Sequence, residues 1–207
     1  LAGDITLDSM IGLNQDLVIQ NTGAGVVRID AGVPTISLFQ VDVGRTVSLT
    51  GLSLLNAQNA VRNYGNLTLT RVLARSNSGS MGGAVTGCVN PATQVLNVVD
   101  SVFINNAAQN GGGAIDACGQ INISGSTFTG NAANYGGALA VTNNGAVNIV
   151  NSTFSGNTAN SFGGAITTDY PGMTLSQVTF SGNAAPTGSA LAVAGGVPVT
   201  ARNTLFA

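Results

Sequence analysis

A single frame of residues is repeated along most of this sequence. Phenylalanine recurs at intervals of 25, 26, 26 and 26 residues, at Phe103, Phe128, Phe154, Phe180 and Phe206. An asparagine stands three residues after this slot in five copies, at Asn77, Asn106, Asn131, Asn157 and Asn183. Most copies continue with Gly-Gly-Ala and an aliphatic residue. A period of this length is typical of a solenoid, in which each repeat packs only on its neighbours.

The pattern inside one repeat predicts the kind of solenoid. Val147 and Ile149 alternate with polar residues, which is the period of a β-strand. Five residues separate Ile149 from Phe154, so the alternation changes phase and the chain must turn between them. A polar loop follows Asn157, and the Gly-Gly-Ala-Ile segment begins a third strand. We therefore predict an all-β fold, a right-handed single-stranded parallel β-helix of roughly 7 to 8 coils with about 25 residues each; a leucine-rich-repeat horseshoe is the alternative.

Stacked coils place equivalent residues in ladders about 4.8 Å apart. We expect the phenylalanine rings to stack inside the column. We expect each asparagine amide to bond its own backbone at a tight turn and the matching asparagine of the next coil. A repeat array has no internal boundary, so residues 1–207 are predicted to form one domain, with irregular first coils over 1–45 and regular repeats over 46–207.

The alternating Phe-x-x-Asn and Gly-Gly-Ala-Ile motifs resemble the repeats of the chlamydial polymorphic outer-membrane protein family. The resemblance covers about residues 67 to 207. The upstream segment is similar to the lead-in of related bacterial surface β-helix proteins. This resemblance implies a structural or adhesive role, without catalysis, in a protein that is secreted or displayed on the cell surface.

The composition excludes several classes of function. The chain has no Lys, Glu, His or Trp, and its charge comes from six Arg and eight Asp, with a net charge of -2. Such a chain cannot present a basic stripe, so a nucleic-acid partner is not expected. No apolar run reaches the length of a transmembrane helix. We predict no metal, cofactor or catalytic residue.

The two cysteines occupy the same position in consecutive coils. Cys88 lies four residues after Ala84, and Cys118 lies four residues after Ala114. Stacked residues are close enough for a disulfide, which would imply export to an oxidising compartment. Two buried free thiols are the alternative.

Charged residues give a second stacked pair and an alternative function. Arg71 and Asp100 each lie three residues before the phenylalanine slot, which predicts a surface ion pair. A carbohydrate-active β-helix enzyme, a hydrolase or lyase, would need clustered Asp with Lys, Arg or His. Here the carboxylates fall at different positions of the repeat, at Asp100, Asp116 and Asp169, which argues against an enzyme. Catalysis is therefore kept only as the alternative to a structural or adhesive role.

Two further sets of residues are candidates for a surface role. Thr127, Thr153 and Thr179 form an outward ladder, which an ice-binding module would use and which ordinary strand propensity also explains. Tyr135 and Phe162 precede the Gly-Gly pair in adjacent coils. They form either an exposed patch or a lid on the polar loop, and we favour the lid.

The low charge and the unpaired strand edges that a β-helix leaves at its first and last coils favour self-association, and the family resemblance implies an adhesive contact. We expect either a host or cell-surface ligand or a second copy of this chain. Head-to-tail stacking of copies would then give a homo-oligomer or a filament.

Overall fold

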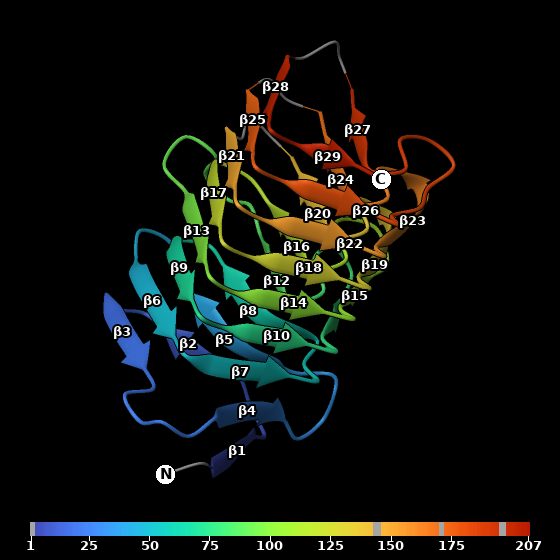
Figure 1. Cartoon of the computed structure of the whole chain (residues 1–207). Helices are drawn as coiled ribbons and strands as arrows, with labels where there is room; N and C mark the ends of the chain where they lie inside the picture. Colours follow the sequence, from blue (N-terminus) through green and yellow to red (C-terminus); the bar gives the residue numbers. More distant parts are fainter. Residues whose placement is uncertain (1–2, 143–145, 170–171, 195–197) are drawn as a thin grey trace.

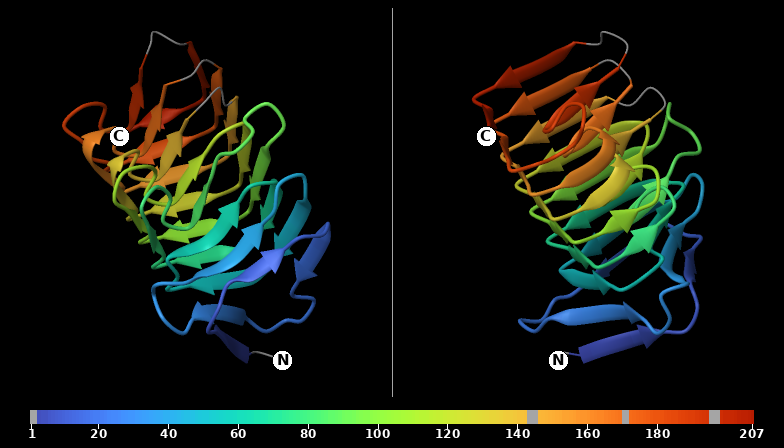
Figure 2. Two further views of the ribbon diagram at one scale, coloured as in Figure 1. Left: turned by 180° about the vertical axis from the view of Figure 1, so that it is seen from behind. Right: turned by 90° about the vertical axis from the view of Figure 1, so that its right-hand side faces the viewer.

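The computed structural model describes residues 3–142, 146–169, 172–194 and 198–207. The chain winds into a column of stacked coils, from the blue N-terminal end to the red C-terminal end (Figures 1 and 2). Neighbouring strands pair in parallel throughout the described residues, and no helix is found there. Two sheets have eight strands and one has nine, so the column has about eight turns. The predicted parallel β-helix is confirmed, and the leucine-rich-repeat alternative is not observed.

Four sheets run along the column, named A to D. Sheet A contains β1 (Gly3–Leu7), β4 (Val27–Ala31), β7 (Leu52–Leu55), β10 (Leu73–Arg75), β14 (Val102–Ile104), β18 (Thr127–Thr129), β22 (Thr153–Ser155), β26 (Thr179–Ser181) and β29 (Leu205–Phe206). Sheet B contains β2 (Ile11–Leu13), β5 (Ser37–Val41), β8 (Asn59–Asn63), β12 (Val85–Gly87), β16 (Ile115–Ala117), β20 (Leu139–Val141), β24 (Ile166–Thr168) and β27 (Leu191–Val193). Sheet C contains β3 (Leu17–Gln20), β6 (Thr46–Thr50), β9 (Asn66–Thr70), β13 (Val95–Val99), β17 (Gln120–Ser124), β21 (Val147–Val150), β25 (Met173–Ser176) and β28 (Val199–Arg202). Sheet D contains β11 (Ser78–Gly79), β15 (Ala107–Ala108), β19 (Ala132–Tyr135) and β23 (Thr158–Phe162).

Sheet D corrects the expectation of three strands in each coil. The segment after each ladder asparagine was predicted to be a polar loop, but in four coils it pairs with its neighbours as a short strand. In β19 and β23 the reason is an inward-facing alanine in the middle of the segment. Ala133 and Ala159 are both buried and lie in register, so even this polar stretch alternates between the interior and solvent.

The phenylalanine ladder occupies the interior. The rings of Phe103, Phe128, Phe154 and Phe180 are fully buried. The centroids of consecutive rings lie 4.8, 4.7 and 5.3 Å apart, which matches the spacing of stacked strands. Phe206 extends the stack at 5.0 Å from Phe180, but its side chain is 52% exposed on the last strand. The sequence prediction of an interior aromatic ladder is confirmed.

The asparagine ladder holds the corner between sheets A and D. The side-chain amide of Asn157 donates to Oδ1 of Asn183 at 2.9 Å, and Oδ1 of Asn157 accepts from Nδ2 of Asn131 at 2.9 Å. The backbone N–H of Asn131 donates to the same oxygen at 3.0 Å. The bond between matching asparagines was predicted. The backbone carbonyl partner belongs to the preceding coil instead, since Nδ2 of Asn157 donates to the carbonyl oxygen of Phe128 at 3.0 Å.

The turn between sheets C and A is a ladder of left-handed residues. Arg71, Asp100 and Asn151 occupy stacked positions with φ of 50°, 49° and 49°. Arg71 and Asp100 are therefore neighbours as predicted, but among the described residues they form no ion pair. The carboxylate of Asp100 lies against Gly125 in the following coil, on the side away from Arg71. The salt bridge found within the described residues joins the exposed side chains of Arg28 and Asp4, at 3.3 Å between Nη1 and Oδ1.

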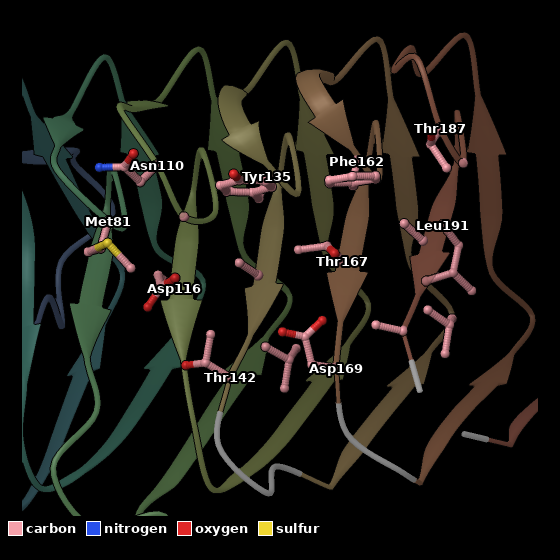
Figure 3. Close-up of a pocket in the computed structure, with 17 residues that line it drawn as sticks. Met81, Asn110, Asp116, Tyr135, Thr142, Phe162, Thr167, Asp169, Thr187 and Leu191 are labelled. Carbon is pink, nitrogen blue, oxygen red and sulfur yellow. The ribbon is translucent and has the colours of Figure 1, made fainter. Parts of the chain in front are cut away.

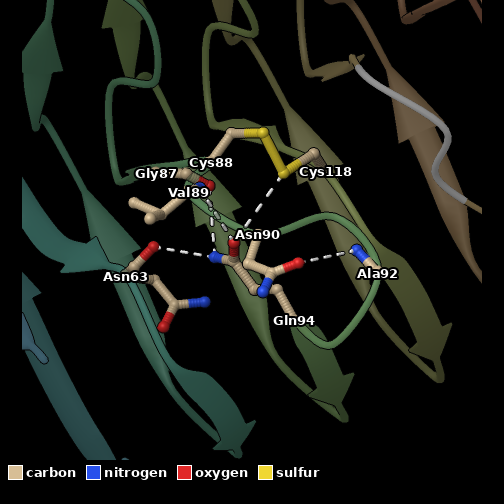
Figure 4. The surroundings of a disulfide bond; sticks show 8 residues. All are labelled: Asn63, Gly87, Cys88, Val89, Asn90, Ala92, Gln94 and Cys118. Carbon is tan, nitrogen blue, oxygen red and sulfur yellow. Dashed lines mark hydrogen bonds between the residues drawn. A yellow bond between two sulfur atoms is a disulfide. The ribbon is translucent and has the colours of Figure 1, made fainter. Parts of the chain in front are cut away.

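Cys88 and Cys118 are joined by a disulfide between neighbouring coils (Figure 4). Their Cα atoms lie 5.3 Å apart, so the stacking predicted from the sequence places them within bonding range. The loop inserted after Cys88 is held by Gln94, whose side chain is buried. Its Nε2 donates to the carbonyl oxygen of Asn63 at 2.8 Å and to that of Gly87 at 3.3 Å. The alternative of two free thiols is excluded.

Candidate binding groove

A groove with a volume of about 710 Å³ runs along the outer face of sheet B (Figure 3). We call it the aromatic groove, after the two rings described below. It is lined by residues of at least four consecutive coils, from Met81 to Ala194. A second hollow of about 590 Å³ adjoins it and shares Met81, Asp116, Thr142 and Asp169. The two hollows form one continuous depression on this side of the column.

Small residues form the floor because the repeats stack in register. Asp116 pairs with Ala140, Ala140 with Thr167, and Thr167 with Ala192. These residues follow the buried aliphatic residue of each repeat, so strand alternation points them outward. Three of the four are alanine or threonine, which leaves space above the sheet.

One side of the groove carries two stacked aromatic rings. Tyr135 ends β19, and Phe162 ends β23. Their ring centroids lie 5.9 Å apart and their planes differ by 8°. Figure 3 shows the rings edge-on, one beside the other along the column. Tyr135 is 40% exposed and Phe162 is 46% exposed. The predicted lid on the polar loop therefore does not form, and the two rings line an open groove as an exposed pair.

The position of these rings depends on a register shift. Ala133 pairs with Ala159, but Tyr135 pairs with Phe162, so β23 contains one more residue than β19 between the two pairs. Such a bulge re-aims the side chain that follows it. Without the shift, Phe162 would not lie beside Tyr135.

Asp116 is the buried carboxylate of the groove. Its side chain is only 5% exposed, and its Oδ2 atom has no hydrogen-bond partner among the described residues. Desolvation by burial raises the pKa of Asp116 from 3.8 to about 6, while the nearby backbone of Gly112 acts in the opposite direction. Gly111 gives the carboxylate its space, because a Cβ atom there would overlap Oδ2.

Asp169 brings a second, exposed carboxylate to the same groove. It follows β24, two coils beyond Asp116 and further along the strand direction. The separation along the column alone is about 10 Å, which is two strand spacings. Within the described ranges, no group of three or more His, Cys, Asp or Glu side chains is placed to hold a metal.

The fold brings together two aspartates that the sequence pattern placed apart. Asp116 and Asp169 hold different positions of the repeat, one and three residues after the aliphatic residue. Both positions face outward on the same sheet, so they line one groove. This parity was readable from the sequence. Asp100 does lie elsewhere, at the turn between sheets C and A.

The threonine ladder is in register but short. Thr127 pairs with Thr153, and Thr153 pairs with Thr179, on the outer face of sheet A. The next positions at the two ends are Val102 and Leu205. All three threonines are half-buried, as expected of ordinary strand residues.

A family model described as the Chlamydia polymorphic membrane protein (Chlamydia_PMP) repeat matches residues 100–118 and 151–169. The chain is similar to this repeat family. Both matched segments begin at the left-handed turn before sheet A and run to the outward position one residue after a sheet B strand, at Cys118 and Asp169. Each matched segment therefore contains the phenylalanine slot, the ladder asparagine and one strand of the groove floor.

The family and the fold together fit a surface β-helix protein. Neither the comparison with curated proteins nor that with solved structures gave a significant match. In the part of the chain that the structure describes, no helix has the length and apolar character needed to cross a membrane.

Proposed function

We propose that this chain is an adhesive, non-catalytic element of the bacterial cell surface that binds its ligand in the aromatic groove. The exposed pair of Tyr135 and Phe162 is the observation that carries this proposal. Large aromatic side chains left in solvent beside a hollow are costly unless a partner covers them, and aromatic residues dominate the binding energy of protein interfaces. The rigid column fixes both rings, so a ligand would order few groups on binding.

Presentation outside the cell is part of the proposal. The matched repeat family is surface-associated, and the disulfide between Cys88 and Cys118 favours an oxidising compartment. A scaffold held by backbone ladders and a cross-link suits exposure to the environment.

Adhesion of coated beads tests the proposal. Beads that carry the wild-type chain should bind to host epithelial cells, and the double variant Tyr135→Ala, Phe162→Ala should reduce bound beads by at least about tenfold, since each ring contributes at hot-spot scale. The matched control is Thr127→Ala, Thr153→Ala, which alters the face of sheet A. Equal adhesion of the groove variant and wild type would overturn the proposal, provided that both unfold at similar temperatures.

A carbohydrate hydrolase is the second candidate, and one observation favours it. The pKa of Asp116, raised to about 6, is suited to a general acid. Against it, the second carboxylate lies about 10 Å away along the column, beyond the spacing that paired glycosidase carboxylates use. Release of reducing sugar from a polysaccharide by the wild-type chain, abolished in Asp116→Asn, would contradict the non-catalytic proposal.

We also propose self-association of this polypeptide through its terminal strands. Among the described residues, strand β1 has a strand partner on one edge only, and so does β29. Leu205 and Phe206 on β29 are exposed, which adds an apolar surface to the free edge. Head-to-tail pairing would bury both edges. Light scattering should show particles that grow with concentration, and strictly monomeric material at all concentrations would contradict it.

A further inference from the structure

Every formal charge that lines the aromatic groove is negative. Asp116 and Asp169 are the charged side chains among its described lining residues, and the chain has no lysine. The nearest cation on the same row of sheet B is Arg62, two coils from Asp116 through Thr86. Its guanidinium is already engaged by Oγ of Ser37 at 2.9 Å and by Oε1 of Gln58 at 3.3 Å.

We infer that the aromatic groove binds an arginine side chain, presented by an extended segment of a partner protein, with its guanidinium on the carboxylate of Asp116. The inference rests on the proposed function, since it assigns the ligand of the same groove. It assigns a role to the carboxylate of Asp116, whereas the adhesive proposal depends on the two rings.

An unpartnered oxygen of Asp116 points to a ligand that donates hydrogen bonds. Buried polar atoms are nearly always hydrogen-bonded, and Oδ2 of Asp116 is buried without a partner among the described residues. A carboxylate accepts hydrogen bonds, so a donor that approaches the carboxylate from the groove would supply a bond to a group that is short of partners. A cationic donor gives the strongest bond and also neutralises the buried charge.

The pair of rings favours arginine as that donor. Tyr135 and Phe162 present two nearly parallel ring planes in the same groove as the carboxylate, in the next two coils (Figure 3). A guanidinium is planar, stacks on aromatic faces and is more weakly hydrated than an ammonium. These properties favour arginine over lysine.

The length and polarity of the groove suit a peptide around the arginine. Its volume of about 710 Å³ exceeds what one side chain fills, and it extends over several coils. Asn110, Thr142, Thr167 and Thr187 supply hydrogen-bonding groups along it. These groups suit the backbone of an extended peptide on either side of the arginine. Asp169, at the exposed side of the groove, adds to the attraction for a basic segment.

Calorimetric titration tests the inference with a short blocked peptide of glycine and serine around one arginine. Two matched peptides carry citrulline or lysine at that position. At pH 7.5 and low salt, the arginine peptide should bind at least about tenfold more tightly than the citrulline peptide, which has the same shape without charge. The lysine peptide should fall between them.

Variants locate the bond. Asp116→Asn should lower the affinity for the arginine peptide by about tenfold or more, whereas Asp169→Asn should lower it by less than about threefold, since exposed ion pairs contribute little. Affinity of the wild type should also fall between pH 7 and pH 5, as Asp116 takes up its proton, and this fall should be absent in Asp116→Asn. The other ionisable groups at the groove are Asp169 and Tyr135, with Arg62 two coils away.

Several binding results would overturn the inference without overturning the proposed adhesive function. Equal binding of the arginine and citrulline peptides, no binding of either, or unchanged affinity in Asp116→Asn would overturn the inference. So would binding of a neutral oligosaccharide in place of the peptide. If beads still lose adhesion in the Tyr135→Ala, Phe162→Ala variant, the proposed function survives any of these results. If that variant adheres normally, the proposed function fails whatever the peptides do.

Discussion

Asp116 combines two properties that follow from the repeat. Strand alternation places its side chain outside sheet B, yet the neighbouring coils bury it almost completely. Its identity, aspartate where the next coils have alanine and threonine, is visible in the sequence. Its burial is not, because it depends on how closely the Gly111 backbone approaches the carboxylate in the folded chain.

Replacement of Asp116 by asparagine should stabilise the protein at neutral pH. The folded-state pKa of about 6 exceeds the ordinary 3.8, so the folded state holds the proton more tightly and loses stability as pH rises from about 4 to 6. The shift of about two units corresponds to about 3 kcal/mol. Urea unfolding should show Asp116→Asn near wild type at pH 4 and up to about 3 kcal/mol more stable at pH 7.

Asp169→Asn is the control for that experiment, since its side chain is exposed. It should change the free energy of unfolding by less than about 0.5 kcal/mol at both pH values. A wild type whose stability relative to Asp116→Asn does not change with pH would contradict the burial of this carboxylate.

The hydrogen bonds of Asn157 lead to a second prediction about a single residue. Its buried amide accepts two hydrogen bonds from Asn131 and donates to Asn183 and to the carbonyl oxygen of Phe128. Asn157→Ala leaves these buried groups without partners and should cost about 1 to 3 kcal/mol. Asn160→Ala, at an exposed position, should cost little. Equal losses in thermal unfolding would show that the asparagine ladder does not stabilise the column.

At the scale of elements, the sequence predicted the strands whose residues face the core and missed those that depend on small residues. The strands of sheets A, B and C contain large aliphatic or aromatic residues at alternate positions, which reveal both their period and the turn between them. In sheet D the inward-facing residues are small, as at Ala133 and Ala159, so the alternation does not stand out from a polar loop. The bulge that aligns Tyr135 with Phe162 is a property of the pairing between two strands, and neither segment shows it alone.

Truncation of one ring should disrupt the phenylalanine ladder. Phe154 is fully buried between Phe128 and Phe180, with ring centroids at 4.7 and 5.3 Å. The rigid column cannot collapse into the space, so Phe154→Ala should cost about 3 to 5 kcal/mol in denaturant unfolding. Phe162→Ala, which removes an exposed ring, should cost less than about 1 kcal/mol. Similar losses at the two positions would show that Phe154 does not lie in a packed interior.

For the whole molecule, the repeat period predicted both the architecture and the contacts between coils. Cys88 and Cys118 lie 30 residues apart in sequence and are bonded, because equivalent repeat positions stack. The prediction of an ion pair between Arg71 and Asp100 was wrong, although the two residues are stacked. Stacking does not determine which neighbouring coil a flexible side chain faces. The groove was missed because its floor, rings and carboxylates come from several coils.

The stacking register is the claim on which the groove and both proposals depend, and engineered disulfides measure it directly. Thr127 and Thr153 are paired on the outer face of sheet A, so cysteines at these two positions should form a bridge, as the native pair does across a 5.3 Å Cα separation. Cysteines at Thr127 and Ser155 are displaced by two residues, or about 8 Å along the diagonal, and should not. Mass spectrometry of the oxidised, unreduced variants should find the new bridge in the first and two free thiols in the second. Efficient bridging of the diagonal pair, with free thiols in the aligned pair, would contradict the account.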